Sequence, residues 1–151
     1  MKSKFLLLAA LTFSMNVSAQ TITSPDKKLE VKLSEKSGNI SYSVNYNGKE
    51  FIKNSPLGLV TDFGDFSKNL KVENFKTDTV TFDYSSKILK KSHITGKATR
   101  GVWSLSHNGQ KIFDIVFMVE NNDIAFKYQL YRSKVNEKDE YPRYCAVIKD
   151  D

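Results

Sequence analysis

The feature that most constrains this chain is a two-residue alternation of apolar and polar side chains, which recurs between turn signals. It is clear in residues 29–33, 40–46, 79–84 and 124–130. Because successive side chains of a β-strand point to opposite faces, this alternation is typical of half-buried strands. No apolar period of 3.6 residues persists over ten residues, so we expect no long amphipathic helix. The sequence therefore predicts an all-β chain.

Turn signals separate the expected strands. Asn47-Gly48 and Asn108-Gly109 are the strongest, because both residue types tolerate the positive φ of a type I′ hairpin turn. Residues 37–39 and 121–123 are weaker turn signals, and 133–140 is polar and loop-like. Further strands are expected at 51–52, 57–63, 72–75, 97–106, 112–119 and 144–148. About ten short strands joined by hairpin turns favour an antiparallel β-sandwich.

The segment from Ser55 to Phe66 is apolar but interrupted by Pro, Gly and Asp. Pro56 lacks a backbone N–H, so we expect it on a strand at the edge of a sheet. Gly58 inside a strand pattern predicts a bulge or a close approach of another backbone. The following Asp-Phe-Gly-Asp-Phe run, residues 62–66, is interpreted as a turn or bulge that leads to the next strand.

The N-terminal residues 1–19 have the pattern of a secretory signal peptide. Lys2 and Lys4 precede an apolar run, and small residues allow cleavage after Ala19. The alternative is a short N-terminal membrane anchor, and the lack of a nearby cysteine disfavours a lipoprotein. No other apolar run approaches the ~18 residues that a transmembrane helix needs. We therefore expect an exported domain over residues 20–151.

Charge and cysteine content exclude two further classes. The formal net charge is +6, but the lysines are scattered rather than gathered on one face, which disfavours nucleic-acid binding. The single cysteine, Cys145, excludes an internal disulfide framework. Cys145 lies in a strand-like run, so a small buried hydrophobe is the expected role, and a catalytic thiol is disfavoured.

The acidic residues give no assignable catalytic pair. Asp62 and Asp65 flank Gly64 and are interpreted as a polar turn, because the other ligands of a calcium loop are missing. Asp114 lies in an apolar strand, where it either has a partner or faces solvent at an edge. The chain has no nucleophile-elbow, zinc or phosphate-loop motif.

Three ring side chains are candidates for binding. Trp103 could stack against a sugar, although a core position is the more common role of a Trp in a sandwich. His93 and His107 flank strands near turns, where solvated or hydrogen-bonded structural roles are favoured over metal ligation. From the residues alone, the chain is an all-β domain without a recognisable active site.

Several ordered motifs resemble the N-terminal domain of glycoside hydrolase family 97. They are Ser24-Pro25-Asp26, Tyr42-Ser43-Val44, Asn47-Gly48-Lys49, Ser55-Pro56-Leu57-Gly58-Leu59, and the runs at 89–94, 121–130 and 146–151. In the 121–130 run, Ile124 and Lys127 depart from the family pattern. The resemblance covers nearly the whole chain after residue 19.

The resemblance implies a partial β-sandwich of the galactose-mutarotase type, truncated at its C-terminal end. In the family this domain precedes a catalytic (β/α)8 barrel, and full-length members resemble α-glucosidases or α-galactosidases with a calcium ion in the active site. The resemblance implies export to the periplasm and places the catalytic and calcium-binding residues beyond this chain. We carry over no catalytic residue, no metal ligand and no cofactor.

Three functions remain as expectations. The first is a non-catalytic domain that supports a catalytic barrel and its active-site mouth, with the chain being either a gene fragment or a piece completed by a partner. The second is a small exported domain that binds α-linked carbohydrate through Trp103 and nearby tyrosines. The third, a stand-alone hydrolase, is disfavoured.

Overall fold

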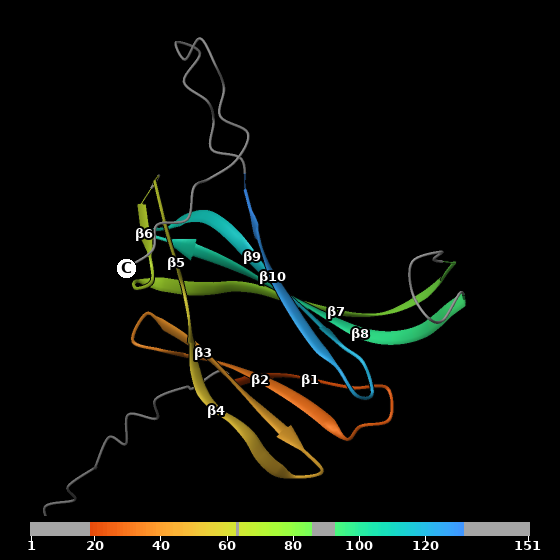
Figure 1. Ribbon diagram of the computed structural model, residues 1–151. Helices are drawn as coiled ribbons and strands as arrows, with labels where there is room; N and C mark the ends of the chain where they lie inside the picture. The colour runs from red at the N-terminus through yellow and green to blue at the C-terminus, as the bar shows by residue number, and fades with distance from the viewer. Residues whose placement is uncertain (1–18, 63, 86–92, 132–151) are drawn as a thin grey trace, which may run out of the picture.

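Two four-stranded antiparallel sheets form the body of the protein (Figure 1). The computed structural model describes residues 19–62, 64–85 and 93–131. Every regular element within these ranges is a strand, as the alternation predicts. The strands are β1 (Ala19–Thr23), β2 (Leu29–Lys36), β3 (Asn39–Tyr46), β4 (Lys49–Leu57), β5 (Leu59–Thr61), β6 (Gly64–Phe66), β7 (Leu70–Ser85), β8 (His93–His107), β9 (Gln110–Val119) and β10 (Ile124–Leu130).

Consecutive strands pair within each sheet. The N-terminal sheet has the order β1-β2-β3-β4, the C-terminal sheet has the order β10-β9-β8-β7, and β5 and β6 form a separate hairpin. The two Asn-Gly turns adopt the predicted positive φ, at 50° and 75° for Asn47-Gly48 and at 51° and 78° for Asn108-Gly109. The sequence prediction of an antiparallel sandwich is therefore confirmed.

The core lies between the two sheets. Alternate residues of each strand face it, so β2 contributes Leu29, Val31 and Leu33, and β9 contributes Phe113 and further residues at two-residue steps. The buried core set is Ile22, Leu29, Val31, Leu33, Ile40, Val44, Leu57, Leu59, Leu70, Trp103, Leu105, Phe113, Ile115, Phe117 and Val119. Burial of apolar surface is the dominant favourable term in folding, so this core set is the main source of the domain's stability.

The predicted strands 72–75 and 79–84 are wrong as separate elements. They form one strand, β7, with an irregularity in its pairing between Val72 and Asn74. The polar interval between them has the composition of a loop, but it pairs with β8 throughout, and Asp78 makes an ion pair with Arg100. β7 is exposed along most of its length, so polar residues are compatible with a strand there.

From Thr99 onward, β8 has β9 as a second neighbour, whereas residues 93–98 pair only with β7. The far ends of β7 and β8 therefore form a two-stranded arm, which projects away from the two sheets in Figure 1. We call this arm, residues 80–85 with 93–98, the β7–β8 arm. A two-stranded ribbon is marginally stable by itself in water.

The predicted strand 57–63 is also divided. β4 ends at Leu57 and β5 begins at Leu59, with Gly58 at the break. An added Cβ at Gly58 would lie 2.7 Å from Ser67 Cα, so the close backbone approach predicted for this glycine is confirmed. Pro56 lies on β4, the edge strand of its sheet, as expected.

Several expectations concern residues outside the described ranges. They are the signal peptide 1–19, apart from its last residue, the loop 133–140, the strand 144–148 and Cys145. In the part of the chain that is described, no helix is long and apolar enough to cross a membrane.

Candidate functional site

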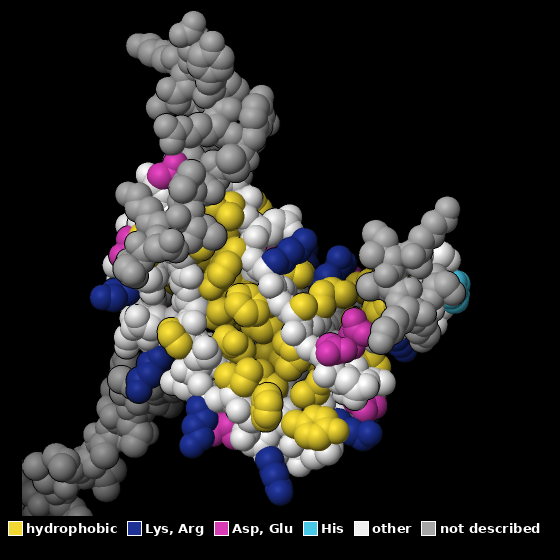
Figure 2. Space-filling model, viewed as in Figure 1, with side chains coloured by type: hydrophobic (Ala, Val, Ile, Leu, Met, Phe, Trp, Pro, Cys, Tyr) yellow, Lys and Arg dark blue, Asp and Glu magenta, His cyan; other side chains and the backbone are white. Residues whose placement is uncertain are grey.

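An apolar opening between the two sheets is the most prominent surface feature. Figure 2 shows apolar side chains gathered in a hollow between β10 and the N-terminal sheet. The core-facing side chains of β10 contribute to it, with Phe126 44% and Leu130 42% exposed. Tyr42 of β3, Ile52 of β4 and Tyr128 of β10 are half-buried beside the core. We call these five residues the open seam.

Aromatic contacts join the sheets across the open seam. The ring of Tyr42 lies 5.3 Å from that of Phe117 and 5.8 Å from that of Phe126, and Phe126 stacks on Phe117 at 5.2 Å. Such pairs add to the area that they bury. Both β4 and β10 are edge strands within the described residues, so the seam is flanked by two open sheet edges.

Tyr128 joins the seam to the interrupted segment after β4. The Gly58 N–H donates a hydrogen bond to the Tyr128 Oη (3.1 Å). Burial raises the pKa of the Tyr128 hydroxyl above its usual range. This contact explains the Leu57-Gly58-Leu59 sequence, because only a residue without a side chain allows the backbone to lie against Ser67 while its N–H reaches the second sheet.

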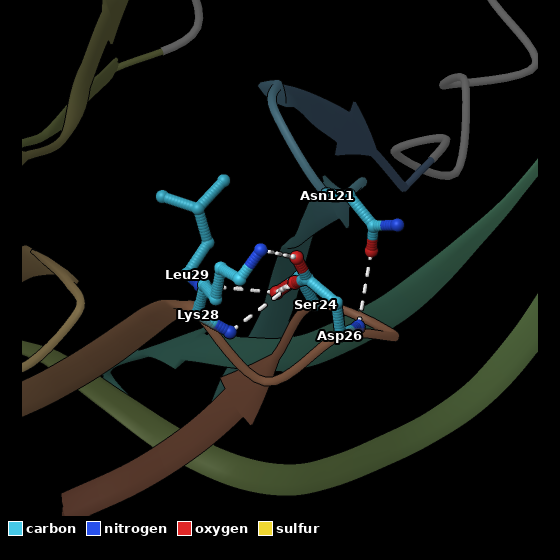
Figure 3. Close-up of polar contacts among 5 residues, drawn as sticks. All are labelled: Ser24, Asp26, Lys28, Leu29 and Asn121. Atoms are coloured by element: carbon cyan, nitrogen blue, oxygen red, sulfur yellow. Dashed lines mark hydrogen bonds and ion pairs between the residues drawn. The ribbon is translucent and has the colours of Figure 1, made fainter.

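The Ser-Pro-Asp motif forms a hydrogen-bond network at the β1–β2 turn (Figure 3). Buried Ser24 donates from Oγ to Asp26 Oδ1 (2.7 Å) and accepts from the Leu29 N–H (3.0 Å). Asp26 Oδ1 also accepts from the Lys28 N–H (3.2 Å), and Asp26 Oδ2 lies 3.2 Å from Lys28 Nζ. These bonds hold the turn closed against the start of β2.

The same turn is linked to the second sheet. The Asp26 N–H donates to Asn121 Oδ1 (3.0 Å), and Asn121 lies in the β9–β10 turn. The hydrogen bond from Ser24, together with those from Lys28, holds the pKa of the Asp26 carboxyl below its usual range. The motif therefore ties the two sheets together at one end and supplies no reactive group.

Trp103 lies in the core. Its side chain is fully buried, stacks on Phe75 at 4.7 Å and meets Phe117 edge-on at 5.7 Å. Its Nε1 is buried without a hydrogen-bond partner. A sugar could contact this ring only if the core opened, so the packing corresponds to the core role rather than to a stacking platform.

The three candidate aspartates lie on two different sheets. Asp65 lies on β6, so the predicted polar turn over residues 62–66 is wrong for this residue. The Ser67 side chain and the Ser67 N–H, which donates to Asp65 Oδ1 (2.8 Å), lower the pKa of its carboxyl. Asp62 lies in the β5–β6 turn. Asp114 is half-buried on β9 and accepts a hydrogen bond from the Tyr131 hydroxyl (2.6 Å), which raises the pKa of Tyr131. Asp114 is therefore on a different sheet from Asp62 and Asp65.

The two histidines lie at opposite ends of β8. His93 pairs with Asp83 (3.3 Å) on the β7–β8 arm, and His107 Nδ1 lies 3.0 Å from the Lys68 carbonyl oxygen. Both rings therefore have polar partners in the structure. Among the described residues, no three His, Cys, Asp or Glu side chains are grouped so that they could hold a metal ion.

Sequence reasoning missed the contacts that connect distant segments. The bond from Asp26 to Asn121 and that from Gly58 to Tyr128 join residues 95 and 70 positions apart. No local pattern predicts such pairs. The one available signal was the alternation of β10, which indicated that Phe126 and Tyr128 share a face.

The fold and these surfaces define a β-sandwich module with no catalytic constellation among its described residues. Residues 22–150 match the Glycosyl-hydrolase 97 N-terminal family, and the chain belongs to this family. The resemblance read from the sequence is therefore confirmed.

The chain is similar to part of much longer proteins. It is 34% identical to a β-arabinopyranosidase of known structure, with a TM-score of 0.72 over 76% of this chain and 18% of that one. A family 97 glycoside hydrolase from Pseudoalteromonas sp. strain K8, solved with acarbose, shares the fold at 17% identity and a TM-score of 0.69, again over 18% of its length.

A curated relative agrees with these structures. A probable retaining α-galactosidase from Streptomyces bingchenggensis (strain BCW-1) is 23% identical over 117 residues, which is 75% of this chain and 18% of that protein. The chain thus spans about a fifth of the relatives that it matches and corresponds to part of a non-catalytic domain.

Proposed function

We propose that this domain supports the catalytic domain and the active-site mouth of a longer family 97 glycoside hydrolase that cleaves α-linked glucosides or galactosides. The observation that carries the proposal is the family match over residues 22–150. The relatives, whose names describe glycosidases, extend far beyond the matched part. In this reading the domain has no chemistry of its own.

The open seam supports the same role. Large apolar side chains such as Phe126 and Leu130 are about two-fifths exposed at the junction of the sheets. Exposed apolar patches beside open sheet edges are typical of surfaces that another segment covers. A free-standing sugar-binding domain would instead present polar groups around an exposed ring.

A domain exchange tests the proposal. This chain replaces the matched part of the β-arabinopyranosidase, and the product is called the exchange enzyme. It is expected to hydrolyse a β-arabinopyranoside, whereas the same enzyme with the matched part deleted is expected to be inactive. Equal inactivity of both would contradict the supporting role.

Calorimetry on the isolated chain distinguishes the supporting role from the alternative, a small carbohydrate-binding domain. Titration with panose, maltose or melibiose at millimolar concentration is expected to release no heat. Saturable heat together with an inactive exchange enzyme would instead identify a carbohydrate-binding domain.

We also propose that the chain is exported to the periplasm with cleavage after Ala19. The n-region, apolar run and small residues of 1–19 support this. Mass spectrometry of the protein recovered from a periplasmic extract is expected to give a mature N-terminus at Gln20. An intact Met1 would contradict it.

A further inference from the structure

Gln20 places a carboxamide at the margin of the core. It lies on β1, the edge strand of the N-terminal sheet, opposite Leu33 of β2. Because side chains two positions apart on a strand share a face, the side chain of Gln20 points to the same side as that of Ile22, which is buried in the core. A polar side chain therefore occupies an inward-facing position near the start of the first strand.

The carbonyl oxygen of this carboxamide is an unused acceptor. Gln20 Oε1 is buried, and no group of the described residues donates a hydrogen bond to it. A buried acceptor without a partner is unfavourable, because it has exchanged its hydrogen bonds to water for none. Within the described part of the chain, no hydrogen bond to this oxygen therefore holds the half-buried side chain in its inward position.

The proposed export of the chain gives Gln20 a second property. Cleavage after Ala19 makes Gln20 the first residue of the mature protein. Before cleavage, the Gln20 nitrogen belongs to a peptide bond with Ala19 and is not nucleophilic. Cleavage turns it into an α-amino group, and such groups titrate just above neutral pH, so part of the population carries the neutral, nucleophilic amine.

The new amine and the side-chain carbonyl carbon belong to the same residue. Attack of the α-nitrogen on Cδ closes an unstrained five-membered ring, and an intramolecular attack of this kind needs no encounter between two molecules. The side chain must first rotate back towards its own backbone. Gln20 lies at the end of an edge strand, where local opening costs little free energy, so the rotation is permitted.

We propose that Gln20 is a modification site, at which the mature N-terminus cyclises to pyroglutamate. The α-nitrogen forms a bond to Cδ, the bond between Cδ and Nε2 breaks, and one proton passes from the α-nitrogen to the departing ammonia. The step exchanges one amide for another and needs no oxidant, reductant or second substrate. The inference rests on the proposed cleavage after Ala19 and adds the fate of the end that cleavage creates.

A cyclised end suits this position better than a free one. The free N-terminus carries an ammonium charge beside inward-facing side chains, where burial disfavours the charged form. The lactam is neutral and keeps one N–H and one carbonyl group. It also replaces a flexible side chain by a rigid ring, so less side-chain entropy is lost when β1 becomes ordered.

Amine labelling of the exported protein tests the proposal. The full chain is produced with its own residues 1–19 and recovered from a periplasmic extract. Its free amino groups are dimethylated on the intact protein before digestion, so that cyclisation during sample handling is not counted. The N-terminal peptide is expected to begin at residue 20, to carry no label on its α-nitrogen and to weigh one ammonia less than the unmodified peptide.

Gln20→Asn is the matched control, because it keeps a carboxamide but could close only a strained four-membered ring. Its α-amino group is expected to be labelled. A labelled α-amino group on an intact Gln20 would overturn the modification and leave the proposed cleavage standing. A peptide that begins at Met1, or at any residue other than 20, would contradict the proposed cleavage and the modification with it. An unlabelled Gln20→Asn protein would also overturn the inference, because something other than lactam formation would then block the amine.

Discussion

At the scale of single residues, the Ser24-Pro25-Asp26 motif illustrates how a recognisable sequence can have a structural rather than a chemical role. Its polar atoms are saturated by neighbours in the β1–β2 turn and by Asn121. The motif was identified from the sequence, but its bond to Asn121 was not, because local patterns carry no information on contacts between distant turns. Trp103 is similar, since its residue type is compatible with two roles and the local sequence does not show that its side chain is buried in the core.

Replacement of Ser24 tests how much the hydrogen-bond network of the β1–β2 turn contributes to stability. Ser24→Ala removes the bond to Asp26 and leaves the Leu29 N–H without its acceptor in a buried place. We expect a loss of about 1–3 kcal/mol in the free energy of unfolding, measured by urea titration. Ser43→Ala, on the solvent side of β3, is the control and is expected to stay within about 0.5 kcal/mol. Equal effects would contradict a special role of Ser24.

Acidification tests the electrostatics of the same turn. The Ser24 hydroxyl, followed by Lys28, lowers the pKa of Asp26 in the folded state relative to the unfolded chain. The folded state then binds fewer protons, so this contribution is present above about pH 4 and is lost as the pH falls through the lowered pKa. We expect the urea midpoint of Asp26→Asn to decrease less between about pH 5 and about pH 3 than that of the parent protein. This pH range is chosen because it spans the ordinary pKa of an aspartate and the pH just below it. An unchanged pH dependence would contradict the assignment.

At the scale of elements, the sequence predicted where strands turn better than where they continue. The Asn-Gly turns have a specific φ requirement, so two hairpins were placed correctly. β7 was divided in two because its polar interval has the composition of a loop. Its continuity depends on β8, which supplies backbone partners and Arg100 for Asp78, and this information is not local.

Two glycines of β8 provide a matched test of packing. An added Cβ at Gly101 would lie 2.7 Å from ring atoms of Trp103 and 2.9 Å from Ile22, all held in the core. At Gly96 it would meet the Phe82 ring, which lies on the β7–β8 arm and can move. We expect Gly101→Ala to cost about 1–3 kcal/mol in urea titration and Gly96→Ala clearly less. The reverse order would show that the arm packs more tightly than the core.

At the scale of the whole molecule, the fold class followed from alternation and turns, whereas the surfaces could not be predicted. The alternation of apolar and polar residues predicts which side chains of one strand share a face. It does not predict which residues of two different sheets meet at an opening. The open seam brings together residues from distant parts of the chain. Tyr42 of β3 and Phe126 of β10 are 84 positions apart in the sequence, yet the centroids of their rings lie 5.8 Å apart.

The exposed seam leads to a prediction for the chain by itself. Leu130 is 42% exposed on the core-facing side of β10, beside an open strand edge, so isolated molecules are expected to associate as concentration rises. Leu130→Lys places a charge at the opening and is expected to reduce this association in static light scattering, while the urea midpoint changes little because the side chain is already partly hydrated. Ser43→Lys adds the same charge on the solvent side of β3 and controls for net charge. If both variants reduce association equally, general repulsion rather than the seam is responsible, whereas a selective effect of Leu130→Lys identifies the seam as the surface that another segment must cover.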